Sequence, residues 1–211
     1  MNLNLQQYIE QEIIPQYQAF DPAHQSEHVY QVIENSLALA ESIPVNQNLV
    51  YTVAAYHDLG LSKGRVGHET ASKLIVYQDR NLNQFFSQSE IQLIGEAVED
   101  HRASIEYEPR SIYGKIVSDA DRDIEIHRLI QRTLSFIHHY YSQADYYYCR
   151  QDTYSYLLRK YGPQASLRLW LDLPATRQRL RNLQAQLLNQ HVFKQIFDPI
   201  YEEIVGPVPK D

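Results

Sequence analysis

Apolar side chains recur at helical spacing along most of this chain. Between residues 5 and 13 they fall close to one helical face, and Pro15 then bends or ends that helix. From 26 to 43 apolar residues again repeat at intervals of three and four, and Pro44 closes the segment. The pattern predicts two amphipathic helices in the first 45 residues.

A third apolar segment follows Asn46, a suitable helix N-cap, and stops near Gly60, which we expect to be a left-handed residue after the helix. The segments 59–67 and 102–110 read as loops. There is no sustained alternation of polar and apolar residues and no Asn-Gly or Asp-Gly turn, so we predict an all-α fold. Further helices are expected at about 68–78, 89–101, 111–120, 123–141, 144–161 and 176–204.

Composition indicates a soluble globular protein. Of the 211 residues, 44% are hydrophobic and 21% are charged, and no internal repeat or low-complexity linker interrupts them, so we expect a single domain over residues 1–211. The net charge of −7 argues against a nucleic acid duplex as the partner. The composition leaves the oligomeric state open.

The chain shows no sign of a membrane or secretory destination. No apolar run approaches the roughly 20 residues that span a bilayer, and the N-terminus lacks the pattern of a signal peptide. The one cysteine, Cys149, fits a reducing compartment. We therefore expect a cytoplasmic protein with no membrane partner.

The stretch AAYHDLG places His57 and Asp58 at the end of an apolar run. Successive residues within a helix point about 100° apart and would not hold one ion, but at a helix end the second residue can leave helical geometry. Imidazole and carboxylate groups suit catalytic Zn, Mn or Fe(II). The pair alone leaves two interpretations open, a helix end that meets water or a metal site.

Other ligand-type residues lie at the ends of predicted helices. His28 is near the start of the helix in HQSEHVYQV, and IVSDADRDIE places Asp119 and Asp121 at the end of another apolar helix. His68 and His101 also lie at helix ends. We expect the remaining five histidines to be structural or solvated: His24, His127, His138, His139 and His191.

The order of these residues resembles the HD-domain metal-dependent phosphohydrolase superfamily, and within it the small stand-alone HD proteins of bacteria. A histidine, an HD pair in AAYHDLG and an aspartate in Ala-Asp-Arg appear in sequence, each with the matching apolar flank. The resemblance covers about residues 20–140. It implies an all-helical HD-domain-like bundle, with a C-terminal helical extension over about 142–205.

The resemblance also implies a ligand set. The motif H…HD…D of the superfamily falls on His28, His57, Asp58 and Asp121, and Asp121 is preferred over Asp119 because it precedes Arg in the Ala-Asp-Arg triplet. The implied cofactor is a divalent ion (Mn, Fe, Mg, Ni, Co or Zn), one or two per chain.

Three residues are expected to act in catalysis. Many members of the superfamily add histidines between the HD pair and the last aspartate, and His68 and His101 occupy such positions. Asp58 could both bind the metal and orient the attacking water. His68 could instead be a solvated residue at a helix start, and His101 a structural one.

Four basic residues lie next to motif residues and are expected to bind substrate phosphate: Lys63, Arg65, Arg102 and Arg122. Guanidinium groups bind phosphate bidentately, which favours the arginines. Any of the four could be a solvated surface charge, and Arg122 could form a structural ion pair.

The function implied is hydrolysis of a phosphoester by metal-activated water, with a small phosphorylated metabolite, expected to be a nucleotide, as substrate and partner. Two specific assignments do not carry over. The guanosine-tetraphosphate hydrolases have a Glu-Asp pair shortly after the HD motif, where this chain reads LGLSKG, and the 5′-nucleotidase branch has a glutamate where this chain has Leu61. The Gly-Tyr-Pro element of the cyclic-dinucleotide branch is also missing.

Two alternatives remain. Some relatives of the fold use a di-iron centre for oxidation, and His68 and His101 supply enough ligands for two metals. The chain could also be a non-catalytic metal-binding sensor or interaction module, with the tyrosine-rich segment 142–162 as its partner surface.

Overall fold

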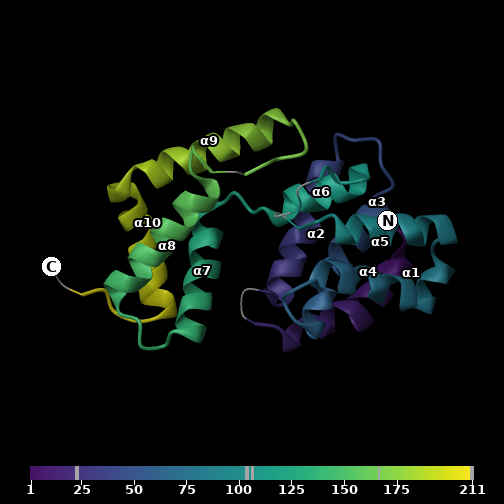
Figure 1. Ribbon diagram of the computed structural model, residues 1–211, viewed down its shortest axis with the longest axis horizontal. Helices are drawn as coiled ribbons and strands as arrows, with labels where there is room; N and C mark the ends of the chain where they lie inside the picture. The colour runs from purple at the N-terminus through teal and green to yellow at the C-terminus, as the bar shows by residue number, and fades with distance from the viewer. Residues whose placement is uncertain (22–23, 103–104, 106, 166, 210–211) are drawn as a thin grey trace. The chain divides into compact units, whose positions relative to one another are not determined.

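A computed structural model describes residues 1–21, 24–102, 105, 107–165 and 167–209. Within those ranges every regular element is helical, which confirms the all-α fold (Figure 1). The expected loop 102–110 contains residues 103, 104 and 106, which lie outside the described part. The α-helices are α1 (Leu3–Tyr8), α2 (Ser26–Ala40), α3 (Gln47–Tyr56), α4 (His68–Gln78), α5 (Gln88–Glu99), α6 (Ile112–Asp121), α7 (Ile126–Tyr140), α8 (Tyr146–Tyr161), α9 (Pro174–Leu188) and α10 (Gln190–Ile204).

The chain divides into two compact units, Met1–Arg122 and Asp123–Asp211, each with its own apolar core. The expected core extended to about residue 140, but α7 packs against α8 and α10 and contributes its apolar face to the second core. The polar turn between α6 and α7 is therefore the boundary, which no compositional break in the sequence marks.

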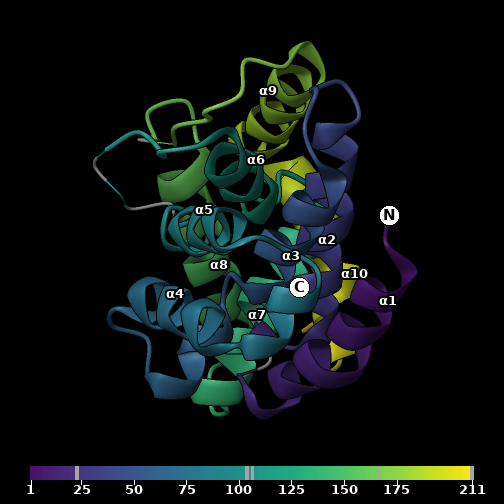
Figure 2. The same ribbon diagram turned by 90° about the vertical axis from the view of Figure 1, so that its right-hand side faces the viewer.

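In the first unit, α3 lies at the centre and contacts α2, α5 and α6, while α4 packs along α5 (Figure 2). All residues from Leu49 to Tyr56 are buried, so α3 is apolar on every side. Asn46 caps α3 as expected, because its side chain accepts a hydrogen bond from the backbone N–H of Asn48 at 3.0 Å.

Helix α3 ends where the HD pair begins. His57 keeps helical backbone angles (φ −53°, ψ −41°), whereas Asp58 leaves them (φ −109°, ψ 5°). A 3-10 helix, Leu59–Lys63, follows directly. The second residue of the pair therefore turns away from the helix axis, as the metal-site interpretation requires.

Gly60 does not have the left-handed conformation expected of it. It lies inside the 3-10 helix, and positive φ values occur instead at Gly64 (112°) and Gly67 (74°). Its importance is steric: a Cβ at this position would lie 2.0 Å from the His68 carbonyl oxygen. The Gly60 N–H donates to Ser72 Oγ at 2.8 Å, so this glycine lets the segment after the HD pair touch the first turns of α4.

Two other segments differ from the expected helices. The first helix continues past residue 8 as a π-helical turn (Ile9–Ile13) and a 3-10 helix (Ile14–Ala19), which accommodates Pro15. The helix expected over 176–204 is two helices, because Asn189 leaves helical geometry and its side chain caps α10. None of the helices in the described ranges is long and apolar enough to cross a membrane.

Replacing Gly60 by alanine should lower the free energy of unfolding by about 3 kcal/mol, because the added methyl group meets backbone atoms that cannot move independently. Ser62→Ala, in the same 3-10 helix, should change it by less than about 1 kcal/mol. Urea unfolding followed by circular dichroism measures both. Equal stabilities would show that the close approach to α4 is not required.

Because the two cores share no residue in the described part, a fragment of residues 1–122 should fold alone. We expect the helical circular dichroism of that fragment to be lost in one cooperative thermal transition. A fragment that stays unfolded in the absence of the second unit would show that the chain folds as one domain.

Candidate metal centre

Four histidine side chains surround the carboxylate of Asp58. Oδ2 of Asp58 lies 3.3 Å from His57 Nε2 and 3.8 Å from His28 Nε2. Oδ1 lies 3.2 Å from His68 Nε2 and 3.3 Å from His101 Nε2. The described residues thus contain two groups of potential metal ligands, His28–His57–Asp58 and Asp58–His68–His101, and Asp58 is common to both.

The ends of four helices bring these residues together. His28 lies in the first turn of α2, His57 and Asp58 follow α3, and His68 is the first residue of α4. His101 lies just after α5. Side chains at helix ends can point into a shared site, whereas those in the middle of these helices pack in the apolar core. The four histidines and Asp58 lie at or next to helix ends, which is where the sequence predicts them.

Asp121 joins the cluster from the last residue of α6. Its Oδ1 lies 3.1 Å from Nε2 of His28, and its side chain is 21% exposed. Asn35 of α2 donates to the carbonyl oxygen of Ala120 at 3.2 Å, which ties the end of α6 to the helix that carries His28. The structure therefore places Asp121 next to His28, although Asp121 belongs to neither of the two ligand groups.

Three of the histidines are oriented by their own helix ends. Nδ1 lies 2.7 Å from the Ala54 carbonyl oxygen in His57, 2.9 Å from that of Arg65 in His68, and 2.6 Å from that of Val98 in His101. A carbonyl oxygen can only accept, so each Nδ1 carries a proton and donates it. Each ring is thereby turned so that Nε2 points toward Asp58, which is the orientation that metal-binding histidines use.

The donor set fits a divalent cation. Without positive charge between them, imidazole lone pairs and carboxylate oxygens about 3.3 Å apart would repel each other. His57 Nε2 is buried and makes no hydrogen bond of acceptable geometry with any described residue. Nitrogen and carboxylate ligands of this kind are typical of Zn, Mn, Fe, Co and Ni sites.

Asp58 is an ionised carboxylate in this setting. Burial raises its pKa, but the facing histidines, His57 foremost, hold the pKa well below its usual range. Burial lowers the pKa of His57, whereas Asp58 raises it, and the net shift is upward. The carboxylate of Asp58 and the protonated ring of His57 therefore stabilise each other.

The members of the cluster differ in exposure. The side chains of His57 and His101 are 0% and 3% exposed, whereas those of His28, His68 and Asp121 are 10%, 11% and 21% exposed. His28, His68 and Asp121 are therefore the members that solvent reaches most, and we refer to them as the accessible edge.

The expected phosphate-binding residues have different environments. Lys63 and Arg65 are exposed, and the carbonyl oxygen of Arg65 accepts from His68. Arg102 is 40% exposed and pairs with Glu69 at 2.8 Å. Arg122 is buried, and its Nη1 donates to Asp119 at 3.0 Å, so the structural ion pair considered for this residue is present and a substrate contact does not fit its burial.

Sequence reasoning did not identify Tyr17 or Asp100. The Tyr17 hydroxyl donates to the Ala55 carbonyl at 2.9 Å and lies 3.3 Å from the Asp58 backbone nitrogen, whose N–H it accepts. Asp100 is fully buried and accepts from Tyr107 and from the backbone and side chain of Arg110. The only indication of Asp100 in the sequence was its position directly before His101.

His24, expected to be structural or solvated, lies beside the cluster. Its Nδ1 is 2.9 Å from both carboxylate oxygens of Asp21, and its ring centroid is 5.9 Å from that of His28. The exposed His127 pairs with Glu125 in the second unit.

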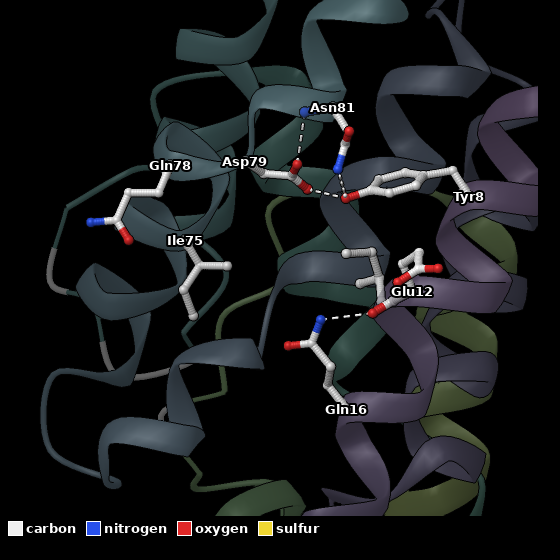
Figure 3. Close-up of a pocket in the computed structure, with 8 residues that line it drawn as sticks. Tyr8, Glu12, Gln16, Ile75, Gln78, Asp79 and Asn81 are labelled. Atoms are coloured by element: carbon white, nitrogen blue, oxygen red, sulfur yellow. Dashed lines mark hydrogen bonds between the residues drawn. The ribbon is translucent and has the colours of Figure 1, made fainter.

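A separate pocket of about 310 Å³ lies between the N-terminal helices and the end of α4 (Figure 3). On one side of the pocket, Asp79 accepts a hydrogen bond from the Tyr8 hydroxyl at 2.6 Å. Gln16 lines another side of the pocket. None of its lining residues belongs to the cluster, so this pocket is not the candidate metal centre.

Comparison with known families decides the assignment. The family model for the HD domain matches residues 26–124, which include every member of the cluster. This segment is similar to the HD domain. The match confirms the resemblance to the HD-domain superfamily over residues 26–124.

One solved structure similar to this chain is that of a predicted HD superfamily hydrolase from an uncultured Thermotogales bacterium. The two share 21% sequence identity, the likeness covers 75% of this chain and 94% of the other, and the TM-score is 0.49. Comparison with curated proteins gave no match.

If Asp58 serves both ligand groups of the HD domain, Asp58→Asn should weaken binding at both, by at least about 100-fold. His101→Ala should weaken binding at the Asp58–His68–His101 group alone. Metal titration with stoichiometry by elemental analysis distinguishes the two variants, and His127→Ala is the control. Full metal content in Asp58→Asn would contradict a shared carboxylate.

Proposed function

We propose that this HD domain is a metal-dependent phosphohydrolase that cleaves a phosphoester of a small metabolite, with a nucleotide as the leading substrate class. The observation that carries the proposal is the shared Asp58 carboxylate, which faces four imidazole Nε2 groups at 3.2–3.8 Å beside an accessible edge.

The chain's own residues have separable roles. His28, His57, Asp58 and Asp121 would hold one ion, and His68 and His101 together with Asp58 would hold a second. Such ions supply Lewis-acid chemistry, lowering the pKa of a coordinated water to about 7 and polarising a phosphoryl oxygen. Asp58 orients the attacking water, because its two oxygens lie between the two histidine groups.

Charge near the accessible edge supports a phosphorylated substrate. Lys63 and Arg65 are exposed and have no ion-pair partner in the described chain, and they lie in the segment that leads to His68. Arg102 follows His101. These three cations give an anionic substrate a local attraction that the net charge of −7 would otherwise oppose.

The two alternatives predict other outcomes. Imidazole and carboxylate ligands also suit a di-iron oxygenase, which would contain iron and consume oxygen. A sensor or interaction module would bind metal without turnover. The exposed tyrosines 140, 141, 147 and 148 of the second unit are the surface such a module would offer.

The test begins with metal analysis of the protein as purified, followed by a phosphatase screen across nucleotides and sugar phosphates with each divalent metal added. We expect metal-dependent phosphate release that falls by at least about 1,000-fold in His57→Ala, while the exposed-site control His127→Ala keeps full activity. Circular dichroism verifies the fold of both variants.

Each alternative has its own signature in this experiment. Hydrolysis unchanged in His57→Ala, or no bound or activating metal, would overturn the proposal. Oxygen consumption by an iron-loaded protein without phosphate release would favour the oxygenase, and metal binding without turnover would favour the module.

A further inference from the structure

An ion pair joins the two residues that follow the histidines of the Asp58–His68–His101 group. Glu69 follows His68 at the start of α4, and Arg102 follows His101 after α5. Oε1 of Glu69 lies 2.8 Å from Nη1 of Arg102. The guanidinium group is thereby linked to His68, because Glu69 also contacts that histidine.

Arg102 has capacity for another ligand. Its bond to Glu69 uses Nη1, and its remaining N–H groups make no hydrogen bond to a described residue. The side chain is 40% exposed. A guanidinium held at one nitrogen, with its other donors facing solvent, can bind the oxygens of a phosphate group without first leaving its protein partner.

Glu69 contacts the cluster as well as Arg102. Its Oε2 lies 3.3 Å from Nδ1 of His68, the nitrogen that also donates to the Arg65 carbonyl, and this oxygen is buried. Glu69 therefore links Arg102 to His68, with one carboxylate oxygen toward each residue.

A second ion pair nearby provides an internal comparison. Lys73 of α4 lies 2.5 Å from Glu99 of α5, in a pair that makes no contact with a cluster histidine. Each pair joins α4 either to α5 or to the segment directly after α5. A purely structural role would therefore be shared by the two, whereas a role in anion binding would belong to Glu69 and Arg102 alone.

We propose that Glu69 is a positioning residue that holds Arg102 as the phosphate-binding group of the metal cluster. This inference rests on the proposed function, because it assigns the recognition of the substrate's phosphate to a guanidinium that Glu69 links to His68. The ligand recognised is a phosphate group with at least two unsubstituted oxygens, which a guanidinium fork can engage.

The test measures binding of inorganic phosphate to the metal-loaded full-length protein by isothermal titration calorimetry. Glu69→Gln keeps the shape of the side chain and should weaken phosphate binding about tenfold. Arg102→Ala should weaken it at least as much, and Arg102→Lys should not restore it, because lysine lacks the fork. Lys73→Gln, which removes the ion pair with Glu99, should leave it unchanged.

A positioning role predicts that the two losses are not additive. Glu69→Gln combined with Arg102→Ala should bind phosphate no more weakly than Arg102→Ala alone. Once a substrate has been found, Glu69→Gln should raise KM about tenfold and change kcat little, with metal content and thermal stability maintained.

The outcomes separate this inference from the proposed function. Wild-type phosphate affinity in Glu69→Gln or in Arg102→Ala would overturn the inference, even if His57→Ala abolishes hydrolysis and the function holds. An equal loss in Lys73→Gln would also overturn it, since α4–α5 packing would then be the cause. Arg102-dependent phosphate binding without any hydrolysis would uphold the inference and refute the phosphohydrolase.

Discussion

Burying an ionised carboxylate is unfavourable unless positive charge or hydrogen-bond donors surround it, and in the first unit that carboxylate is Asp58. It is surrounded by the Nε2 atoms of four imidazole rings, and three of these rings donate from Nδ1 to backbone carbonyl oxygens. Rings held in this way compensate the buried charge when they are protonated and can bind a divalent cation when they are neutral. The packing of α3 among its neighbours, the turn after it and the close approach at Gly60 all place this one group.

Most of the candidate metal centre could be predicted from the sequence, because histidine and aspartate are recognisable as potential ligands from residue type alone. His28, the HD pair and Asp121 come together as their order and apolar flanks predicted. Their meeting depends on helix ends, and helix ends follow from local signals such as the Asn46 cap. That residues as distant as 28 and 121 lie close together was expected only from the family resemblance, because their spacing in the sequence does not predict it.

Other features could not be predicted because they depend on tertiary contacts. The sequence marks Gly60 as a turn residue, but the contact that requires it is the carbonyl of His68 across the unit. Arg122 was adjacent to a ligand in sequence and is nevertheless buried against Asp119. The boundary after Arg122 exists because α7 packs into the second core, and the composition of the sequence does not predict that packing.

The convergence of five helix ends on the cluster also affects the unfolded chain. A cation bound by residues as distant in sequence as His28, His101 and Asp121 would close several long loops of the chain simultaneously. It would act as a removable cross-link, so that metal supply would set how often the first unit opens as well as what it can catalyse. Chelation would then loosen helices that never touch the ion.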